Sequence, residues 1–154
     1  MTVTVGGDVL PLSVDEVNSL WQTTRARRQH EDVDIGLRCV SEAEIQDLNK
    51  RYRQRDESTN ALTFSYPSSQ TGDQQSSDSD VGFPTHDIVL CLAVAEREAE
   101  AREMMLRDYA AWLLVHAFLH VTGLDHESSD QAAASTTQAE VAILAAAGYQ
   151  PTIL

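Results

Sequence analysis

The chain has 154 residues, a hydrophobic fraction of 42% and a formal net charge of −13 at pH 7. These values exclude an intrinsically disordered chain and predict a single globular domain over residues 1–154. No apolar segment is long enough to span a membrane, and the N-terminus lacks a signal or transit pattern, so we expect a cytoplasmic protein. The negative charge argues against nucleic-acid binding unless basic residues are locally concentrated.

Patterns of apolar residues predict alternating strands and helices in the first half of the chain. Ser41 and Glu44 have the spacing of a capping box, which predicts where the second helix begins. The expected elements are a strand or hairpin turning at Gly6-Gly7, a helix over 13–30 with Val14, Val17, Leu20 and Trp21 on one face, a strand over 34–40, a helix from Ser41, and a strand over 60–66 with Leu62 and Phe64 on one face.

The second half of the chain begins with a polar segment over 67–84, rich in Ser, Gln and Asp, which we expect to be a mobile acidic loop inside the domain. Cys39 and Cys91 are expected to be free, buried thiols of a reducing compartment. The further elements expected are a buried strand over 86–93, a charged helix over 96–107, an apolar helix that carries two histidines, and a last helix ended by Gly148.

Three of the five histidines lie in the segment HAFLHVTGLDH, residues 116–126. His116 and His120 are four residues apart and therefore share one face of a helix. Gly123 can end that helix in a left-handed conformation, so that the chain turns back and His126 approaches the same point. Three imidazoles with a fourth position left open are typical of a catalytic zinc site. The alternative, ordinary core histidines, would require two imidazoles to find partners on an apolar helix, which is costly.

The spacing H-x3-H-x5-H is also that of the metzincin proteases, in which a glutamate follows the first histidine as general base. Ala117 stands at that position here, so a protease mechanism would lack its proton acceptor. Asp125 is the only acid within the segment. It could orient one of the histidines through a hydrogen bond, or it could be a solvated turn residue.

The histidine segment resembles the pattern H-G-x-L-H-L-x-G-Y-D-H of the YbeY family of endoribonucleases. Elsewhere in the chain, His86 and Thr136-Thr137 depart from the residues usual in that family. Further blocks resemble the family in the same order: "LNKRYRQRDESTNALTFSYP" (48–67), "HDIVL" (86–90) and "EVAILAAAGYQP" (140–151). The resemblance covers the chain from about Glu42 to its end. Within the histidine segment the matching residues are His116, Leu119, His120, Gly123, Asp125 and His126.

The resemblance implies a small α/β (α+β) sandwich, in which a four-stranded mixed sheet and several helices surround a central metal-binding helix with a metzincin-like site. It implies a zinc-dependent, single-strand-specific endoribonuclease that matures the 3′ end of small-subunit (16S) rRNA and acts in ribosome quality control. The small ribosomal subunit and the GTPase Era would be its partners. The family's functional arginine falls on Arg53, which could grip a phosphate with two hydrogen bonds. We expect a metal-bound hydroxide to attack the phosphodiester, with Arg53, His116 and His120 as catalytic residues.

Seven of the eleven basic residues fall in two clusters at predicted helix ends. If both clusters flank the metal, an acidic protein can still present a positive RNA groove; otherwise they are unrelated exposed helix ends. Two other functions stay open, namely a metalloprotease-like hydrolase and a non-catalytic ribosome-assembly factor with a structural metal. The clusters consist of Arg25, Arg27 and Arg28, and of Lys50, Arg51, Arg53 and Arg55.

Overall fold

The structure is a computed structural model that describes residues 3–7, 10–65, 86–123 and 130–149, with side chains for 10–65, 86–123 and 134–149. The acidic segment predicted over 67–84 lies outside these ranges, as do Asp125 and His126. The elements are β1 (Val3–Gly7), α1 (Val14–Arg28), β2 (Ile35–Cys39), α2 (Glu42–Arg53), β3 (Ala61–Ser65), β4 (His86–Leu90), α4 (Leu92–Ala101), α5 (Leu106–Val121) and α6 (Asp130–Ala147).

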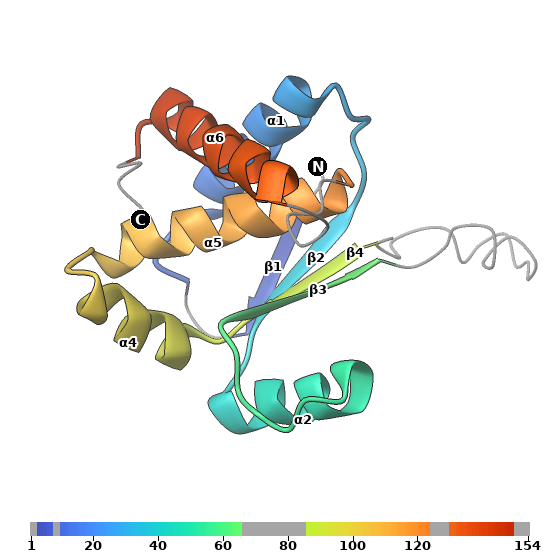
Figure 1. Ribbon diagram of the computed structural model, residues 1–154, viewed down its shortest axis with the longest axis vertical. Coiled ribbons are helices and arrows are strands. Elements are labelled where there is room, and N and C mark those ends of the chain that lie inside the picture. The colour runs from blue at the N-terminus through green and yellow to red at the C-terminus, as the bar shows by residue number, and fades with distance from the viewer. Residues whose placement is uncertain (1–2, 8–9, 66–85, 124–129, 150–154) are drawn as a thin grey trace, which may run out of the picture.

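The strands form one mixed sheet in the order β1-β2-β4-β3 (Figure 1). β1, β2 and β4 are parallel, whereas β3 runs antiparallel to β4 and lies at one edge. Gly6 and Gly7 belong to β1 and pair with Arg38 and Cys39 of β2, so the hairpin turn predicted at these glycines is wrong. Parallel neighbours need a long crossover connection, and α1 provides it here.

The first two helices begin at the serines that precede them. Ser13 and Glu16 form a full capping box, in which each side chain bonds the other residue's backbone N–H. Ser41 accepts a hydrogen bond from the backbone N–H of Glu44 at 3.1 Å, as predicted. The carboxylate of Glu44 lies 3.6 Å from Arg38 Nη1 on the neighbouring strand.

The predicted apolar face of α1 is confirmed except at its first residue. Val17, Leu20 and Trp21 are fully buried, whereas Val14 is 47% exposed. Val14 occupies the first helical position, one turn before the stretch of α1 that packs against the core. Leu62, on the edge strand, packs with Phe64 in a smaller apolar cluster on the α2 side of the sheet, so their predicted common face is also confirmed.

Two predicted boundaries after β4 are wrong. β4 ends at Leu90, and Cys91 already caps α4, so the predicted strand over 86–93 is too long. The charged helix predicted over 96–107 is interrupted, because Glu103 adopts a left-handed conformation with φ of 56° between α4 and α5. Cys91 and Cys39 are both buried and free, as predicted.

Helices cover both faces of the sheet: α1, α5 and α6 lie on one side and α2 on the other, which confirms the α/β (α+β) class (Figure 1). α5 is the central helix, because it contacts α1, α4, α6 and β3. Ten of its sixteen residues are buried, a larger share than in α1 or α2. Within the described ranges, no helix combines the length and apolar composition needed to cross a membrane.

Candidate functional site

The face of α5 that is not fully buried carries Trp112, His116 and His120. These residues are four apart, so they form one row along the helix. The residues between them, 113–115 and 117–119, are all buried in the core. The rings of His116 and His120 have centroids 5.0 Å apart, and those of Trp112 and His116 are 5.8 Å apart. The predicted common face of the two histidines is therefore confirmed.

α5 ends as the sequence predicts. Gly123 has a φ of +97°, a conformation that L side chains rarely adopt, and its N–H donates to the carbonyl of His120 at 2.9 Å. The predicted third ligand, His126, and the predicted orienting residue, Asp125, follow this turn outside the described residues. Side chains in the described ranges form no group of three or more potential metal ligands, so two of the three predicted ligands are placed here.

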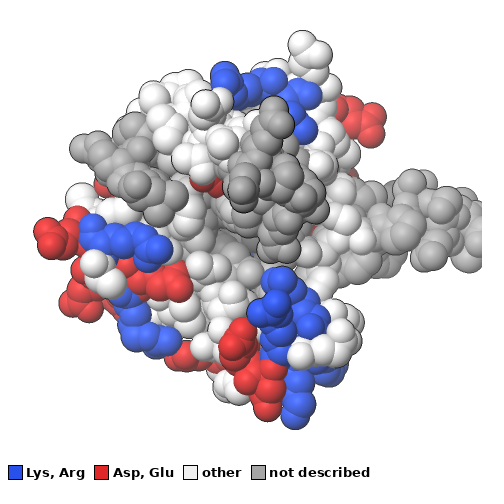
Figure 2. Space-filling view, viewed as in Figure 1, with Lys and Arg blue, Asp and Glu red and all other residues white. Residues whose placement is uncertain are grey.

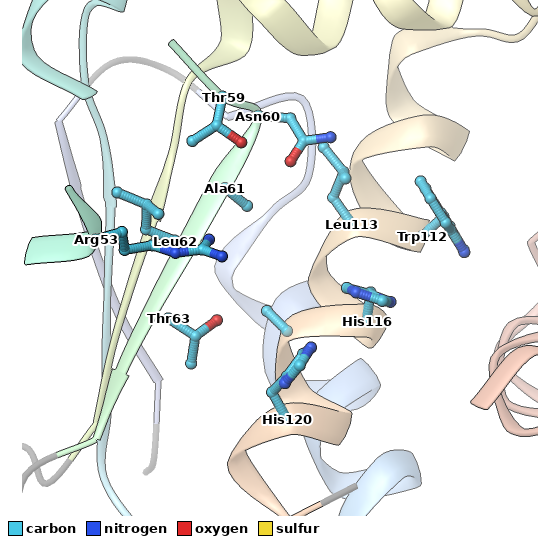
Figure 3. Close-up of a pocket in the computed structure, with 11 residues that line it drawn as sticks. Arg53, Thr59, Asn60, Ala61, Leu62, Thr63, Trp112, Leu113, His116 and His120 are labelled. Atoms are coloured by element: carbon cyan, nitrogen blue, oxygen red, sulfur yellow. The ribbon is translucent and has the colours of Figure 1, made fainter. Parts of the chain in front are cut away.

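A pocket of about 360 Å³ lies between α5 and the edge strand β3 (Figure 3). His116 and His120 line one wall. The opposite wall is built from β3 and the residues just before it, including Thr59, Asn60 and Thr63. Arg53, at the end of α2, also lines the pocket, and Figure 3 shows its guanidinium directed across the pocket toward α5. Residues more than sixty positions apart thus meet in one cavity.

Glu140 of α6 holds His116 from behind the pocket. Its Oε2 lies 2.5 Å from His116 Nδ1, and its Oε1 accepts a hydrogen bond from Trp112 Nε1 at 2.9 Å. The Glu140 side chain is 5% exposed. Because a carboxylate only accepts hydrogen bonds, this contact puts the ring proton of His116 on Nδ1. In a neutral ring Nε2 then carries the lone pair, which is the form of imidazole that ligates metals.

Sequence reasoning missed Glu140 and Trp112. The signal in the sequence was weak: Glu140 is the only acid in the alanine-rich stretch 131–147. An acid at the same helical face as Ile143 and Leu144, which are buried, has to find a partner in the core. Its partner on α5 could not be identified before the packing of α6 on α5 was known.

Arg53 differs from the other three basic residues of its cluster. Lys50, Arg51 and Arg55 each lie within 4 Å of a carboxylate, at 3.9, 3.0 and 3.8 Å respectively. No ion pair or hydrogen bond of the Arg53 side chain is found among the described residues, although it is exposed and lines the pocket. Three of the four cations therefore lie beside a carboxylate, whereas Arg53 does not.

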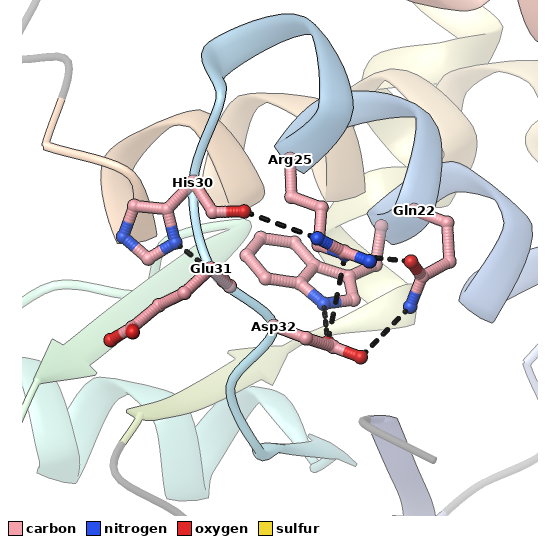
Figure 4. A network of polar contacts seen from close by, with 6 residues as sticks. Gln22, Arg25, His30, Glu31 and Asp32 are labelled. Atoms are coloured by element: carbon pink, nitrogen blue, oxygen red, sulfur yellow. Dashed lines mark hydrogen bonds and ion pairs between the residues drawn. The ribbon is translucent and has the colours of Figure 1, made fainter.

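Arg25, in the other basic cluster, is part of a polar network that fastens the segment after α1 (Figure 4). Its Nε donates to Gln22 Oε1 at 2.6 Å and lies 3.8 Å from Asp32 Oδ1, and its Nη1 donates to the carbonyl of His30 at 3.2 Å. Asp32 also accepts a hydrogen bond from Trp21 Nε1 at 2.8 Å. Arg25 thus has a structural role even when no RNA is bound.

Of the two remaining residues of this cluster, one has a hydrogen-bond partner and the other has none among the described residues. Arg28 donates from Nε to Thr122 Oγ1 at 3.1 Å and so ties the end of α1 to the end of α5. Arg27 is exposed, and no partner of its guanidinium is found in the described part of the chain. Figure 2 shows basic and acidic side chains interleaved over α2 and a separate basic group over α1. The predicted role of both clusters in RNA binding stays a prediction.

Comparison with known proteins gives a consistent family. The family model described as "Endoribonuclease YbeY" matches residues 13–148. The chain is 39% identical over 118 residues to an endoribonuclease YbeY of Delftia acidovorans, covering 77% of this chain and 70% of that protein. It is 41% identical over 116 residues to one from Janthinobacterium sp., covering 75% and 70%.

A solved structure shares the fold. The solution structure of TM1509 from Thermotoga maritima superposes with a TM-score of 0.57 at 20% identity, covering 94% of this chain and 91% of that one. The family model spans the stretch from the capping box of α1 to the glycine that ends α6, and so includes every described residue of the pocket. The chain belongs to the endoribonuclease YbeY family.

Proposed function

We propose that the protein is a metal-dependent endoribonuclease that hydrolyses phosphodiester bonds of single-stranded RNA. The observation that carries the proposal is that Arg53, which has no carboxylate partner among the described residues, faces His116 and His120 across one pocket. A phosphodiester is an anion, so a cation opposite a metal site suits it. The relatives from Delftia acidovorans and Janthinobacterium sp. are named endoribonucleases, which supports the same activity.

We propose that His116, His120 and His126 hold one Zn²⁺ per chain. The two described histidines fit such an ion, because their rings are adjacent and because Glu140 keeps the proton of His116 on Nδ1. Neutral imidazoles are the nitrogen ligands that zinc prefers. When bound, the ion would supply Lewis acidity and activate a water molecule at neutral pH. Asp125, next to His126, would be a further residue that orients a ligand.

Arg53 would bind the scissile phosphate. Its planar guanidinium can donate two parallel hydrogen bonds to two phosphate oxygens, which fixes the phosphate and stabilises the charge that develops in the transition state. Since the neighbouring cations Lys50, Arg51 and Arg55 are engaged by carboxylates, contacts from them to RNA would first have to replace those ion pairs. We therefore assign the main electrostatic role in the pocket to Arg53.

The rival functions each lack support at one position. A metzincin-like protease needs a carboxylate at residue 117, and Ala117, which lines the pocket, cannot remove a proton from water. A purely structural metal would be closed by a fourth protein ligand. The described pocket-lining residues other than the two histidines include no Cys, Asp or Glu. This composition favours a site with room for substrate.

We place the activity in the cytoplasm, in maturation of the 3′ end of small-subunit rRNA and in ribosome quality control, with the small ribosomal subunit and the GTPase Era as partners. This assignment rests on the family. Binding of the purified protein to small subunits carrying precursor rRNA would test it directly.

The decisive experiment combines metal analysis with cleavage assays. Protein purified without added metal should contain about one zinc per chain and should cleave a labelled single-stranded RNA. Two other substrates, a double-stranded RNA and an unrelated denatured protein, are incubated with the enzyme in parallel and should stay intact. Cleavage of the denatured protein but not of the RNA would overturn the proposal in favour of the protease. Full activity in a metal-free sample would overturn the metal site.

A further inference from the structure

A second polar network reaches the pocket from the side away from Glu140. Asn60 lies just before β3, Glu98 on α4 and Tyr109 on α5. The Oε1 atom of Glu98 accepts two hydrogen bonds, one from Asn60 Nδ2 at 2.8 Å and one from Tyr109 OH at 2.7 Å. Asn60 is the member of this network that lines the pocket.

The hydroxyl group of Tyr109 remains a hydrogen-bond donor at neutral pH. Tyr109 is 1% exposed. Burial, together with the hydrogen bond to Glu98 and its negative charge, raises the pKa of the Tyr109 phenol to about 12. The hydroxyl therefore keeps its proton at neutral pH and stays available as a donor to Glu98.

This arrangement decides which way the Asn60 amide points. Glu98 is a carboxylate and accepts only, so the NH₂ group of Asn60 must face it and the carbonyl Oδ1 must turn away. The backbone of Asn60 is also held, because its carbonyl accepts a hydrogen bond from the N–H of Cys91 at 3.0 Å. With backbone and amide both fixed, Asn60 presents an acceptor whose orientation needs no rearrangement when a ligand binds.

Asn60 lies at one end of the pocket wall and Thr63 nearer the other (Figure 3). They are three positions apart in the chain, so their Cα atoms lie at most about 10 Å apart. Figure 3 shows Arg53 at the level of Leu62, between these two residues along the wall, so a nucleoside that adjoins a phosphate at Arg53 on one side would lie toward Asn60. Figure 3 shows the Asn60 side chain reaching from the start of β3 toward α5 near Leu113.

We propose that Asn60 is a substrate-binding residue whose Oδ1 accepts a hydrogen bond from the nucleoside next to the scissile phosphate, and that Glu98 is the positioning residue that sets this polarity. The proposal rests on the proposed function, which supplies the RNA. The ligand chemistry is a hydrogen-bond donor of a nucleoside. Two sources exist, the ribose 2′-hydroxyl and the exocyclic amino group of a base.

The test uses three short homopolymers that differ in one donor: oligoadenylate, its 2′-deoxy counterpart, and an oligomer of purine riboside, which lacks the amino group. Equilibrium affinity is measured by fluorescence anisotropy, and cleavage of the two RNA oligomers is followed in the same samples. The variants are Asn60→Ala and Glu98→Gln. Glu100→Gln, on the exposed side of the same helix, is the matched control.

The wild type should bind oligoadenylate about three- to tenfold more tightly than the oligomer that lacks the relevant donor, the range typical of one hydrogen bond. Asn60→Ala should lose this discrimination. Glu98→Gln should weaken it, because a glutamine can turn either its oxygen or its NH₂ group toward Asn60 and so no longer fixes which way the Asn60 amide points. Glu100→Gln should keep it. If the variants lose discrimination against the deoxy oligomer, the donor is the ribose 2′-hydroxyl. If they lose discrimination against the purine riboside oligomer, the donor is the amino group of the base.

Discrimination that survives in both Asn60→Ala and Glu98→Gln would overturn the inference, and so would a wild type indifferent to both donors. Melting temperatures and zinc contents show whether either variant is misfolded. If Glu98→Gln is misfolded, the result for Asn60→Ala alone decides the test. The two proposals fail differently. A wild type that discriminates through Asn60 but never cleaves RNA removes the catalytic proposal and keeps the binding site.

Discussion

Glu140 lies 24 residues after His116 in the sequence, yet its carboxylate oxygen is 2.5 Å from the Nδ1 atom of that histidine. The second oxygen of the same carboxylate is engaged by Trp112 at 2.9 Å. Trp112 therefore holds one oxygen of Glu140, while the other oxygen holds His116. The last helix is in this way part of the support of the proposed metal site.

Replacement of Glu140 should weaken metal binding more than it weakens the fold. Glu140→Gln offers one acceptor oxygen where Trp112 and His116 each need one, so one donor is left without its bond. We expect zinc affinity to fall about 10- to 100-fold, as is typical when the partner of a ligand histidine is lost. Titration of the metal-free protein with zinc measures this. Trp112→Phe, which keeps the bond between Glu140 and His116, should lose less zinc affinity. Equal losses in both variants would contradict the role assigned to the Glu140–His116 bond.

Replacement of Arg53 should abolish cleavage and leave the fold intact. Arg53→Ala should keep the zinc content and melting temperature of the wild type, while the cleavage rate falls about 10²- to 10³-fold. Arg51→Ala is the matched control, because Arg51 is paired with Asp47 at 3.0 Å on the same helix. It should change the rate little. Arg53→Lys should restore only part of the activity, because an ammonium cannot grip two oxygens as a planar fork. Comparable rates for Arg53→Ala and Arg51→Ala would refute the special role of Arg53.

Removal of the metal should lower stability. If His116, His120 and His126 bind zinc, part of the binding free energy is also free energy of folding. A chelator should therefore lower the melting temperature of the wild type. His120→Ala should melt lower than the wild type in zinc, and the gap should narrow in chelator. Full zinc occupancy in His120→Ala would show that this residue is not a ligand.

Acid should destabilise the junction after α1 through Asp32. Partial burial alone would raise the pKa of the Asp32 carboxyl, but hydrogen bonds from Trp21 and Gln22 and the charge of Arg25 hold it below the ordinary value of 3.8. A lowered pKa in the folded state means that the contribution to stability is complete above pH 3.8 and is lost as the pH falls through the folded-state value.

The test of this pH dependence is the variant Asp32→Asn, which keeps an acceptor for Trp21 but cannot titrate. It should be less stable than the wild type at neutral pH, and the difference should shrink as the pH falls below 3.8. Urea unfolding at a series of pH values measures this. A constant difference across the acid range would show that the charge of Asp32 contributes nothing to stability.

Local patterns in the sequence were sufficient for the row of histidines and for the turn at Gly123. Spacing of four on a helix fixes which side chains share a face, and only the residues of the helix itself decide it. The paired glycines of β1 were misread, because a turn and a strand position both tolerate glycine. Only the pairing with β2, more than thirty residues away in the sequence, distinguishes the two.

The remaining features of the site depend on packing between elements. Arg51, Arg53 and Arg55 look alike in the sequence, and only the positions of nearby carboxylates and of the pocket distinguish Arg53 from the others. The contacts of Glu140 and of Glu98 likewise join separate helices. No periodicity within a single helix contains that information.

The position of β3 at the edge of the sheet has a consequence for solubility. Among the described strands β3 pairs only with β4, so the hydrogen-bonding groups on its other side are open to a strand of another molecule. The charged side chain of Arg53 next to such an edge discourages this pairing, as charges at sheet edges do in general. We therefore expect Arg53, which is assigned to the phosphate, also to oppose pairing of this edge with a second molecule when no RNA is bound.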